Sequence, residues 1–127
     1  VTWDRVTETM NQIEATIRTS LAPWNEKVHV FSHLSHVYPS GSSIYTTFVW
    51  RLAEDHRTMI KQWRTMKQAA SRVIVNAGGT ISHQHGVGLD HRPYLEAEKG
   101  STGVAALKAL FTHLDPDQRM NPTKLLP

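Results

Sequence analysis

The feature that most constrains the fold is a pair of short segments with two-residue alternation, joined by a turn. Residues 27–36 place Val28 and Val30 on one side and the histidines and the phenylalanine on the other. Residues 43–51 are dense in β-branched and aromatic side chains, which favour strands. Residues 39–42 read Pro-Ser-Gly-Ser, a composition typical of a turn. The pattern predicts an antiparallel hairpin.

Three segments carry apolar residues every three or four positions, as amphipathic helices do. They are residues 3–21, 54–77 and 103–114, and residues 93–99 predict one or two further helical turns. Proline stops the first helix, the pair Gly78-Gly79 ends the second in a left-handed cap, and Ser101 or Thr102 can cap the third. The third helix is expected to turn these apolar side chains inward: Val104, Leu107, Leu110, Phe111 and Leu114. We therefore predict an α+β fold, an antiparallel sheet covered by helices, in a single domain over residues 1–127.

Composition narrows the classes of function. With 127 residues, 39% hydrophobic and 20% charged, the chain suits one soluble domain, and it has no apolar run near the ~20 residues of a membrane span. The net charge is +3, but Lys and Arg are spread from Arg5 to Lys124 without a run or stripe, so no nucleic-acid partner is predicted. The absence of cysteine excludes disulfides and thiol nucleophiles and fits a cytoplasmic location.

Histidines gather in two neighbourhoods. Six of the eight are His29, His33, His36, His83, His85 and His91. The second group lies in a segment, residues 78–88, that holds four glycines and so permits close approach of a ligand. If residues 80–82 and the segment after them are extended, His83 and His85 share one face and Gln84 lies opposite. This arrangement suits proton transfer or anion binding; the alternative is a loop whose imidazoles hydrogen-bond the backbone.

Tyr45 is the second candidate. In the second strand Ile44, Thr46, Phe48 and Trp50 share one face, so Tyr45 is expected on the less apolar face. A phenol there can exchange a proton with a substrate, although packing alone would also explain it. His33 and His36, at the end of the first strand, could add substrate contacts or simply bind nearby carbonyls.

A metal site is the alternative reading of the histidine segment. His83 and His85, with His91 or Asp90, offer three nitrogen or oxygen donors of the kind zinc or iron accepts. However, such His-x-His metal sites usually lie in many-stranded barrels, whereas three helices and one hairpin are predicted here. We therefore predict no metal.

Several motifs in order resemble a known family. They are Gly79-Thr80-Ile81-Ser82-His83-Gln84-His85-Gly86-Val87-Gly88, Pro93-Tyr94-Leu95 with Glu98, Leu114-Asp115-Pro116 and Met120-Asn121-Pro122-Thr123-Lys124-Leu125-Leu126. Together they resemble the C-terminal domain of FAD-linked oxidases of the vanillyl-alcohol oxidase type. The resemblance implies a ferredoxin-like substrate domain. It also implies that residues 1–127 are the C-terminal substrate or cap portion of a longer enzyme, that FAD is bound chiefly by an absent N-terminal domain, and that this portion alone is inactive.

Within that superfamily, different motifs resemble different groups of enzymes. The Ser35-His36-Val37-Tyr38 stretch, followed by Gly41 and Ile44-Tyr45, resembles alkylglycerone-phosphate synthases, which exchange an acyl for an alkyl chain in ether-lipid synthesis. There a tyrosine matching Tyr45 is the proposed acid/base, and a run of three histidines matches His83 and His85 but not Gln84. The tail, residues 121–124, is instead similar to D-lactate and glycolate dehydrogenases.

The resemblance assigns expected roles. Tyr45 and His83 would handle a substrate proton, and His36 and Gln84 would contact a small-molecule substrate, either a hydroxyacid or a glycerone-phosphate ester. The residues expected at FAD are His85, Gly86, Gly88 and Asn121. The alternatives are a 2-hydroxyacid dehydrogenase, a stand-alone metal-binding domain and a dimerisation domain. A homodimer and a peripheral membrane association of the whole enzyme remain open.

Overall fold

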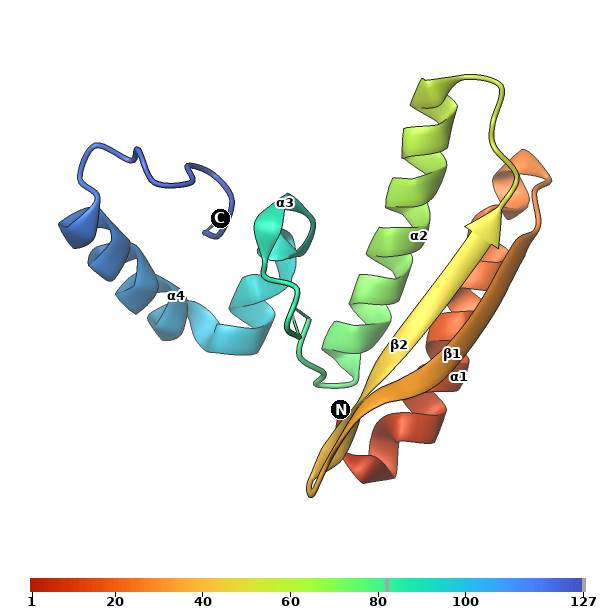
Figure 1. The fold of residues 1–127 in the computed structure, drawn as a ribbon, viewed down its shortest axis with the longest axis horizontal. Coiled ribbons are helices and arrows are strands. Elements are labelled where there is room, and N and C mark those ends of the chain that lie inside the picture. The colour runs from red at the N-terminus through yellow and green to blue at the C-terminus, as the bar shows by residue number, and fades with distance from the viewer. Residues whose placement is uncertain (82, 127) are drawn as a thin grey trace. The chain divides into compact units, whose positions relative to one another are not determined.

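The computed structural model describes residues 1–81 and 83–126 and divides the chain into two compact units (Figure 1). The first unit spans Val1–Gly79 and the second begins at Thr80, and each is described by itself. The first unit contains these elements: α1 (Trp3–Ser20), η1 (Ala22–Trp24), β1 (Val28–Tyr38), β2 (Gly41–Trp50) and α2 (His56–Asn76). The second contains α3 (Gly88–His91), η2 (Arg92–Tyr94) and α4 (Leu95–Leu114).

The predicted hairpin is confirmed, with strands longer than expected. β1 and β2 pair antiparallel, from Val28 opposite Trp50 to Tyr38 opposite Gly41. The register shifts by one residue between Leu34 and His36, which marks a β-bulge. With the three long helices, this sheet confirms the predicted α+β class.

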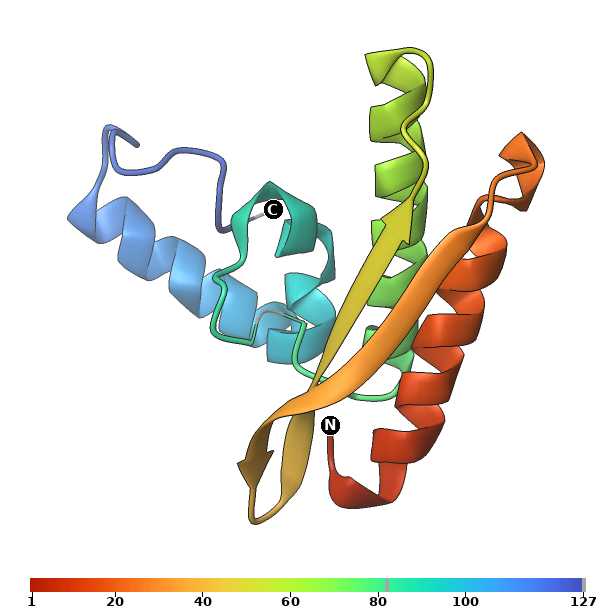
Figure 2. The same ribbon diagram turned by 45° about the vertical axis from the view of Figure 1, so that its right-hand side comes forward.

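Both long helices of the first unit cover the same face of the hairpin (Figures 1 and 2). Their inner faces meet the even-numbered side chains of β1 in one apolar core: Ile13, Ile17, Leu21, Val28, Val30 and Met66. Met66 of α2 is fully buried there. Burial of this apolar surface is the main force that holds α1 and α2 to the sheet.

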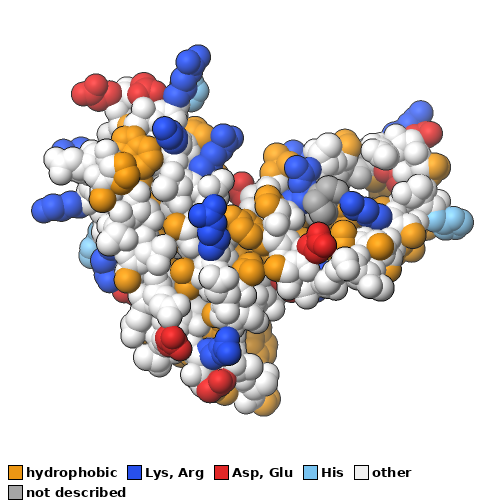
Figure 3. Space-filling view, turned by 180° about the vertical axis from the view of Figure 1, so that it is seen from behind, with side chains coloured by type: hydrophobic (Ala, Val, Ile, Leu, Met, Phe, Trp, Pro, Cys, Tyr) orange, Lys and Arg blue, Asp and Glu red, His pale blue; other side chains and the backbone are white. Residues whose placement is uncertain are grey.

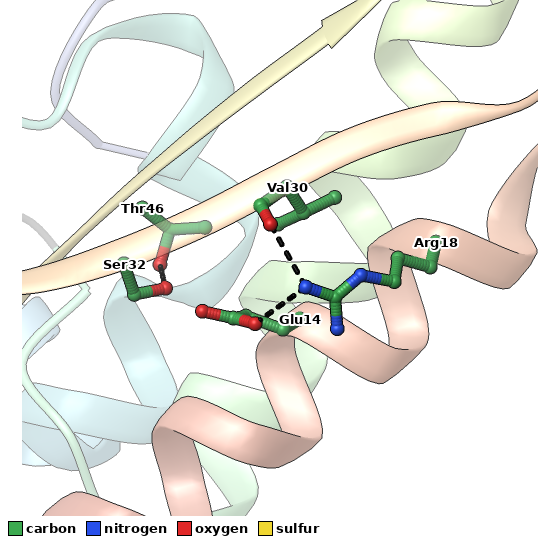
Figure 4. Close-up of polar contacts among 5 residues, drawn as sticks. All are labelled: Glu14, Arg18, Val30, Ser32 and Thr46. Atoms are coloured by element: carbon green, nitrogen blue, oxygen red, sulfur yellow. Dashed lines mark hydrogen bonds and ion pairs between the residues drawn. The ribbon is translucent and has the colours of Figure 1, made fainter.

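Polar contacts join α1 to the sheet at the edge of this core (Figure 4). The Arg18 guanidinium donates to the Val30 carbonyl at 2.8 Å and pairs with Glu14 at 2.7 Å. The hydroxyls of Ser32 and Thr46 lie 2.9 Å apart across the two strands (Figure 4). These contacts give the polar groups near the covered face hydrogen-bond partners.

Both ends of α2 have recognisable caps. The Asp55 carboxylate accepts a hydrogen bond from the Thr58 N–H at 2.9 Å, and this bond lowers the pKa of Asp55. At the other end, Gly78 has φ +67°, its N–H donates to Val75, and the Gly79 N–H donates to Ile74. These two bonds form a Schellman motif, as predicted from the glycine pair.

The second unit departs from expectation in two respects. α4 starts at Leu95 and runs through the expected caps Ser101 and Thr102, with a non-helical break at Gly100 (φ 71°). Of its expected inward side chains, Val104 is buried and Leu107 half-buried, while Leu110, Phe111 and Leu114 are exposed. The spacing was correctly helical, but the second unit has too little packed structure to cover that face.

No helix in the described part of the chain is long and apolar enough to cross a membrane.

Candidate functional site

Tyr45 lies on the open face of the hairpin, opposite the helices. It is 45% exposed and pairs with His33 across the strands. The two rings stack at a centroid distance of 5.2 Å with an interplanar angle of 24°. The predicted placement of Tyr45 away from the core is therefore confirmed, and its neighbour is an imidazole.

The bulge at Ser35 decides which face His36 occupies. In a regular strand, His33 and His36 would point to opposite faces because they are three residues apart. The extra residue places His36 opposite Ser43, which shares strand parity with Tyr45, and the Ser35 and Ser43 hydroxyls lie 2.7 Å apart. His36 thus joins Tyr45 on the open face. Sequence parity alone missed this, because a single inserted residue leaves no clear pattern.

The histidine segment of the second unit is a turn, which corrects the expectation of an extended His-x-His. His83, Gln84 and His85 all lie in turn conformation, and the His85 N–H donates to the His83 carbonyl at 2.7 Å. Gln84 has φ +49°, in the left-handed region that non-glycine residues seldom adopt. Of the predicted extended stretch 80–82, Ile81 is also in a turn and Ser82 lies outside the described residues. Strand parity therefore does not set the directions of these imidazoles.

The glycines that follow keep the backbone of this turn open. Gly86 and Gly88 have φ of +76° and +59°, and no atom would lie within 4 Å of a Cβ built on either. Their role is conformational, because side chains rarely adopt these angles. A ring nitrogen of His91 lies 3.2 Å from the Gly86 carbonyl, so the Nδ1–H tautomer would donate to it. The sequence had suggested His91 only as a metal ligand.

The tail that carries Asn121 is held to the second unit by two sets of contacts. Arg92 donates to the Thr123 carbonyl at 2.7 Å. The Asp115 carboxylate accepts from the N–H groups of Arg119 and Met120 at 2.9 and 2.7 Å. Asn121 itself has φ +51° and is exposed. The tail therefore lies against η2, as a segment unable to fold alone is expected to do.

Over residues 1–81 and 83–126, no group of three or more His, Asp or Glu side chains is arranged to hold a metal ion. The donor set suggested by sequence, His83 and His85 with His91 or Asp90, is thus not gathered into such a group. The geometry offers no support for the metal alternative.

The predicted site residues fall into two groups, one in each unit. Tyr45 and His36 belong to the hairpin of the first unit, while Gln84, the paired histidines and the two glycines belong to the turn of the second. The hairpin group presents a phenol and imidazoles. The turn group presents imidazoles, an amide and open backbone. Both carry side chains for proton exchange and hydrogen bonding.

The comparison with family models identifies the class of protein. Residues 1–125 match the family of FAD linked oxidases, C-terminal domain. The chain therefore belongs to this family, as its sequence motifs predicted.

The individual relatives, like the motifs, include both alkyldihydroxyacetonephosphate synthases and enzymes named for D-lactate or glycolate. An alkyldihydroxyacetonephosphate synthase of Trypanosoma brucei brucei is 33% identical over 95 residues, 75% of this chain and 15% of that protein. The mitochondrial D-lactate dehydrogenase [cytochrome] 1 of Saccharomyces cerevisiae is 32% identical over 69% of this chain and 14% of its own length. The glycolate oxidase subunit GlcD of Bacillus subtilis is 43% identical over 47% of this chain and 13% of its own. The chain spans about one seventh of the length of these relatives.

Proposed function

We propose that this chain forms part of the substrate-pocket wall in a FAD-dependent enzyme of the alkylglycerone-phosphate synthase type. The observation that carries the proposal is the stacked pair His33–Tyr45 on the open face of the hairpin, with His36 brought to the same face by the bulge. This places a phenol beside imidazoles on a surface that a small molecule can reach. The similarity to alkyldihydroxyacetonephosphate synthases supports the substrate class, a glycerone-phosphate ester.

In this proposal Tyr45 and His83 exchange a proton with the substrate hydroxyl. A general acid or base must lie within hydrogen-bond reach of the proton it moves, and both residues are at least partly exposed to solvent. His36 and Gln84 contact the substrate through a ring nitrogen and a side-chain amide. Gln84 can orient a substrate group but cannot shuttle a proton, so we assign it no acid/base role.

The turn of the second unit fits the approach of a flat ring system. Its open backbone at Gly86 and Gly88 leaves room for such a group, and His85 and the exposed Asn121 add polar side chains. We assign these four residues to FAD, which when bound supplies the redox chemistry of the family. The main FAD-binding domain would lie elsewhere in the enzyme, so this portion alone would be inactive. A cytoplasmic location and a homodimer stay part of this proposal.

The proposal is tested in the full-length enzyme with Tyr45→Phe, which keeps the ring on His33 and removes only the hydroxyl. We expect kcat to fall about 100-fold or more, because general acid–base catalysis contributes that much. Tyr38→Phe is the matched control, since Tyr38 is another hairpin tyrosine, and it should retain normal turnover. Near-normal turnover in Tyr45→Phe would overturn the assignment.

His83 is tested in the same assay. His83→Ala should also lower kcat about 100-fold. The control is His29→Ala, which changes an exposed histidine near the start of β1 and should leave kcat unchanged. Equal losses in both variants would indicate a loss of folding instead of catalysis.

A second candidate is a 2-hydroxyacid dehydrogenase. The identity to the glycolate oxidase subunit and to the D-lactate dehydrogenase favours it. Bleaching of the bound flavin by D-lactate or glycolate, without acyl-for-alkyl exchange, would select this candidate over the synthase.

A further inference from the structure

The outer face of α2 is rich in Lys and Arg side chains. The helix, His56–Asn76, contains five Lys or Arg and no acidic residue. The five are Arg57, Lys61, Arg64, Lys67 and Arg72. Along the sequence they form no run, and a stripe was not expected. The helix corrects that expectation, because its geometry brings residues far apart in the sequence onto one side.

Four of these cations share a narrow arc. At 3.6 residues per turn, Arg57, Lys61, Arg64 and Arg72 fall within about 80° of the helix circumference, over about 22 Å of its length. All four are exposed. The opposite side of α2 carries the buried Gln62 and Met66, so the stripe faces away from the core of its own unit. Figure 3 shows several Lys and Arg side chains on the helical side of this unit, among hydrophobic and acidic ones.

Within the described residues, no ion pair neutralises the cations of the stripe. The ion pairs found there are Arg18–Glu14, Lys99–Glu98 and Arg119–Asp117, and none involves α2. Two acidic residues precede the helix, Glu54 and Asp55, and among the described residues neither forms an ion pair with α2; Asp55 accepts the Thr58 N–H at the N-terminal cap. Four aligned cations without acidic partners form a local positive field that favours an anionic surface.

Apolar side chains border the stripe. Ile60, between Arg57 and Arg64 in the sequence, is 43% exposed. Lys61 lies over the ring of Trp24, 5.7 Å from its centroid. Cations that flank exposed aliphatic and indole groups match the boundary between lipid headgroups and acyl chains. A nucleic-acid surface would instead be bordered by hydrogen-bonding side chains that read phosphates and bases.

We propose that the outer face of α2 is a docking surface for an anionic phospholipid bilayer. The straight stripe faces a plane of headgroup charges, and clusters of four or more Lys and Arg on an amphipathic helix attract such membranes. α2 keeps its apolar face in the core and stays folded on the protein. The contact is thus electrostatic and peripheral. It stands on observations separate from those behind the proposed activity.

The test is co-sedimentation of the purified 127-residue chain with phosphatidylcholine vesicles that contain phosphatidylserine. The chain should sediment with these vesicles, and not with pure phosphatidylcholine vesicles, and added salt should release it. Arg57→Glu/Arg64→Glu should weaken binding at least about 30-fold. Each cation near an anionic surface contributes about 1 kcal/mol, and 1.4 kcal/mol is a factor of ten.

Controls make the result specific to α2. Lys108→Glu/Lys124→Glu changes the net charge equally at exposed positions of the second unit and should leave binding nearly unchanged. Lys61→Gln/Arg72→Gln removes two charges from the stripe without reversing them. It should also weaken binding to the vesicles, through the same loss of electrostatic attraction. If both pairs of stripe variants keep their helical circular dichroism and still bind as the parent does, the proposal is wrong. Binding to a DNA duplex but not to the vesicles would also overturn it.

Discussion

The two units of the chain bury their apolar side chains to different extents. In the first unit, two helices and a hairpin close over a shared core, and the unit has seven buried apolar side chains: Val6, Ile13, Ile17, Leu21, Val28, Val30 and Met66. In the described part of the second unit the buried apolar side chains are Ile81, Leu95 and Val104, whereas Leu110, Leu114 and Met120 are more than half exposed. The first unit thus holds most of the packing that stabilises the chain.

The two units also position their candidate site residues in different ways. On the hairpin, Tyr45 and His36 are positioned by strand register, and the register is fixed by the core beneath. In the second unit, His83 and His85 are positioned by a turn with a positive φ at Gln84 and glycines beyond it. Strand register thus positions the candidate residues of the first unit, and local backbone conformation positions those of the second.

The largest change in stability is expected from a substitution in the core of the first unit. Met66→Ala removes a fully buried side chain between α1, α2 and β1, so it should lower the free energy of unfolding by about 2–5 kcal/mol. Urea unfolding followed by circular dichroism measures this change. A loss below about 1 kcal/mol would mean that the first unit is not the cooperative core of the chain.

A smaller effect is expected at the N-terminus of α2. Asp55→Ala removes the hydrogen bond to the Thr58 N–H and should lower the Tm by a few degrees. Because that bond lowers the pKa of Asp55 in the folded state, its stabilisation is present above the unfolded carboxyl pKa. It is lost as the pH falls through the folded value. Thermal melts of parent and variant should therefore converge in acid, and Asp55→Asn should restore part of the cap at neutral pH.

The smallest effect is expected in the second unit. Leu110→Ala on α4 acts on a side chain that is 53% exposed, so it should change the free energy of unfolding by less than about 0.5 kcal/mol. The same urea titration compares it directly with Met66→Ala. A cost as large as in the core would show that α4 buries this face in solution, and the contrast between the units would break down.

The sequence by itself determined the α+β class, the hairpin, the two long helices of the first unit and the C-terminal cap of α2 at its glycine pair. These features depend on local periodicity and turn chemistry. It also determined the family, through motifs that need no coordinates. Parity alone put Tyr45 on the open face. Each of these properties depends on residues that are close together in the chain.

Tertiary structure decided the rest, since it depends on residues distant in sequence. The bulge at Ser35 moved His36 to the face of Tyr45, and the pairing across the hairpin stacked His33 on the phenol. The His83–His85 segment became a turn, and the apolar face of α4 stayed largely exposed. Helix geometry aligns the cations of residues 57–72, and the packing of the other side of α2 into the core turns them outward. Register, burial and the facing of a helix are set by what packs against each element, which local sequence does not specify.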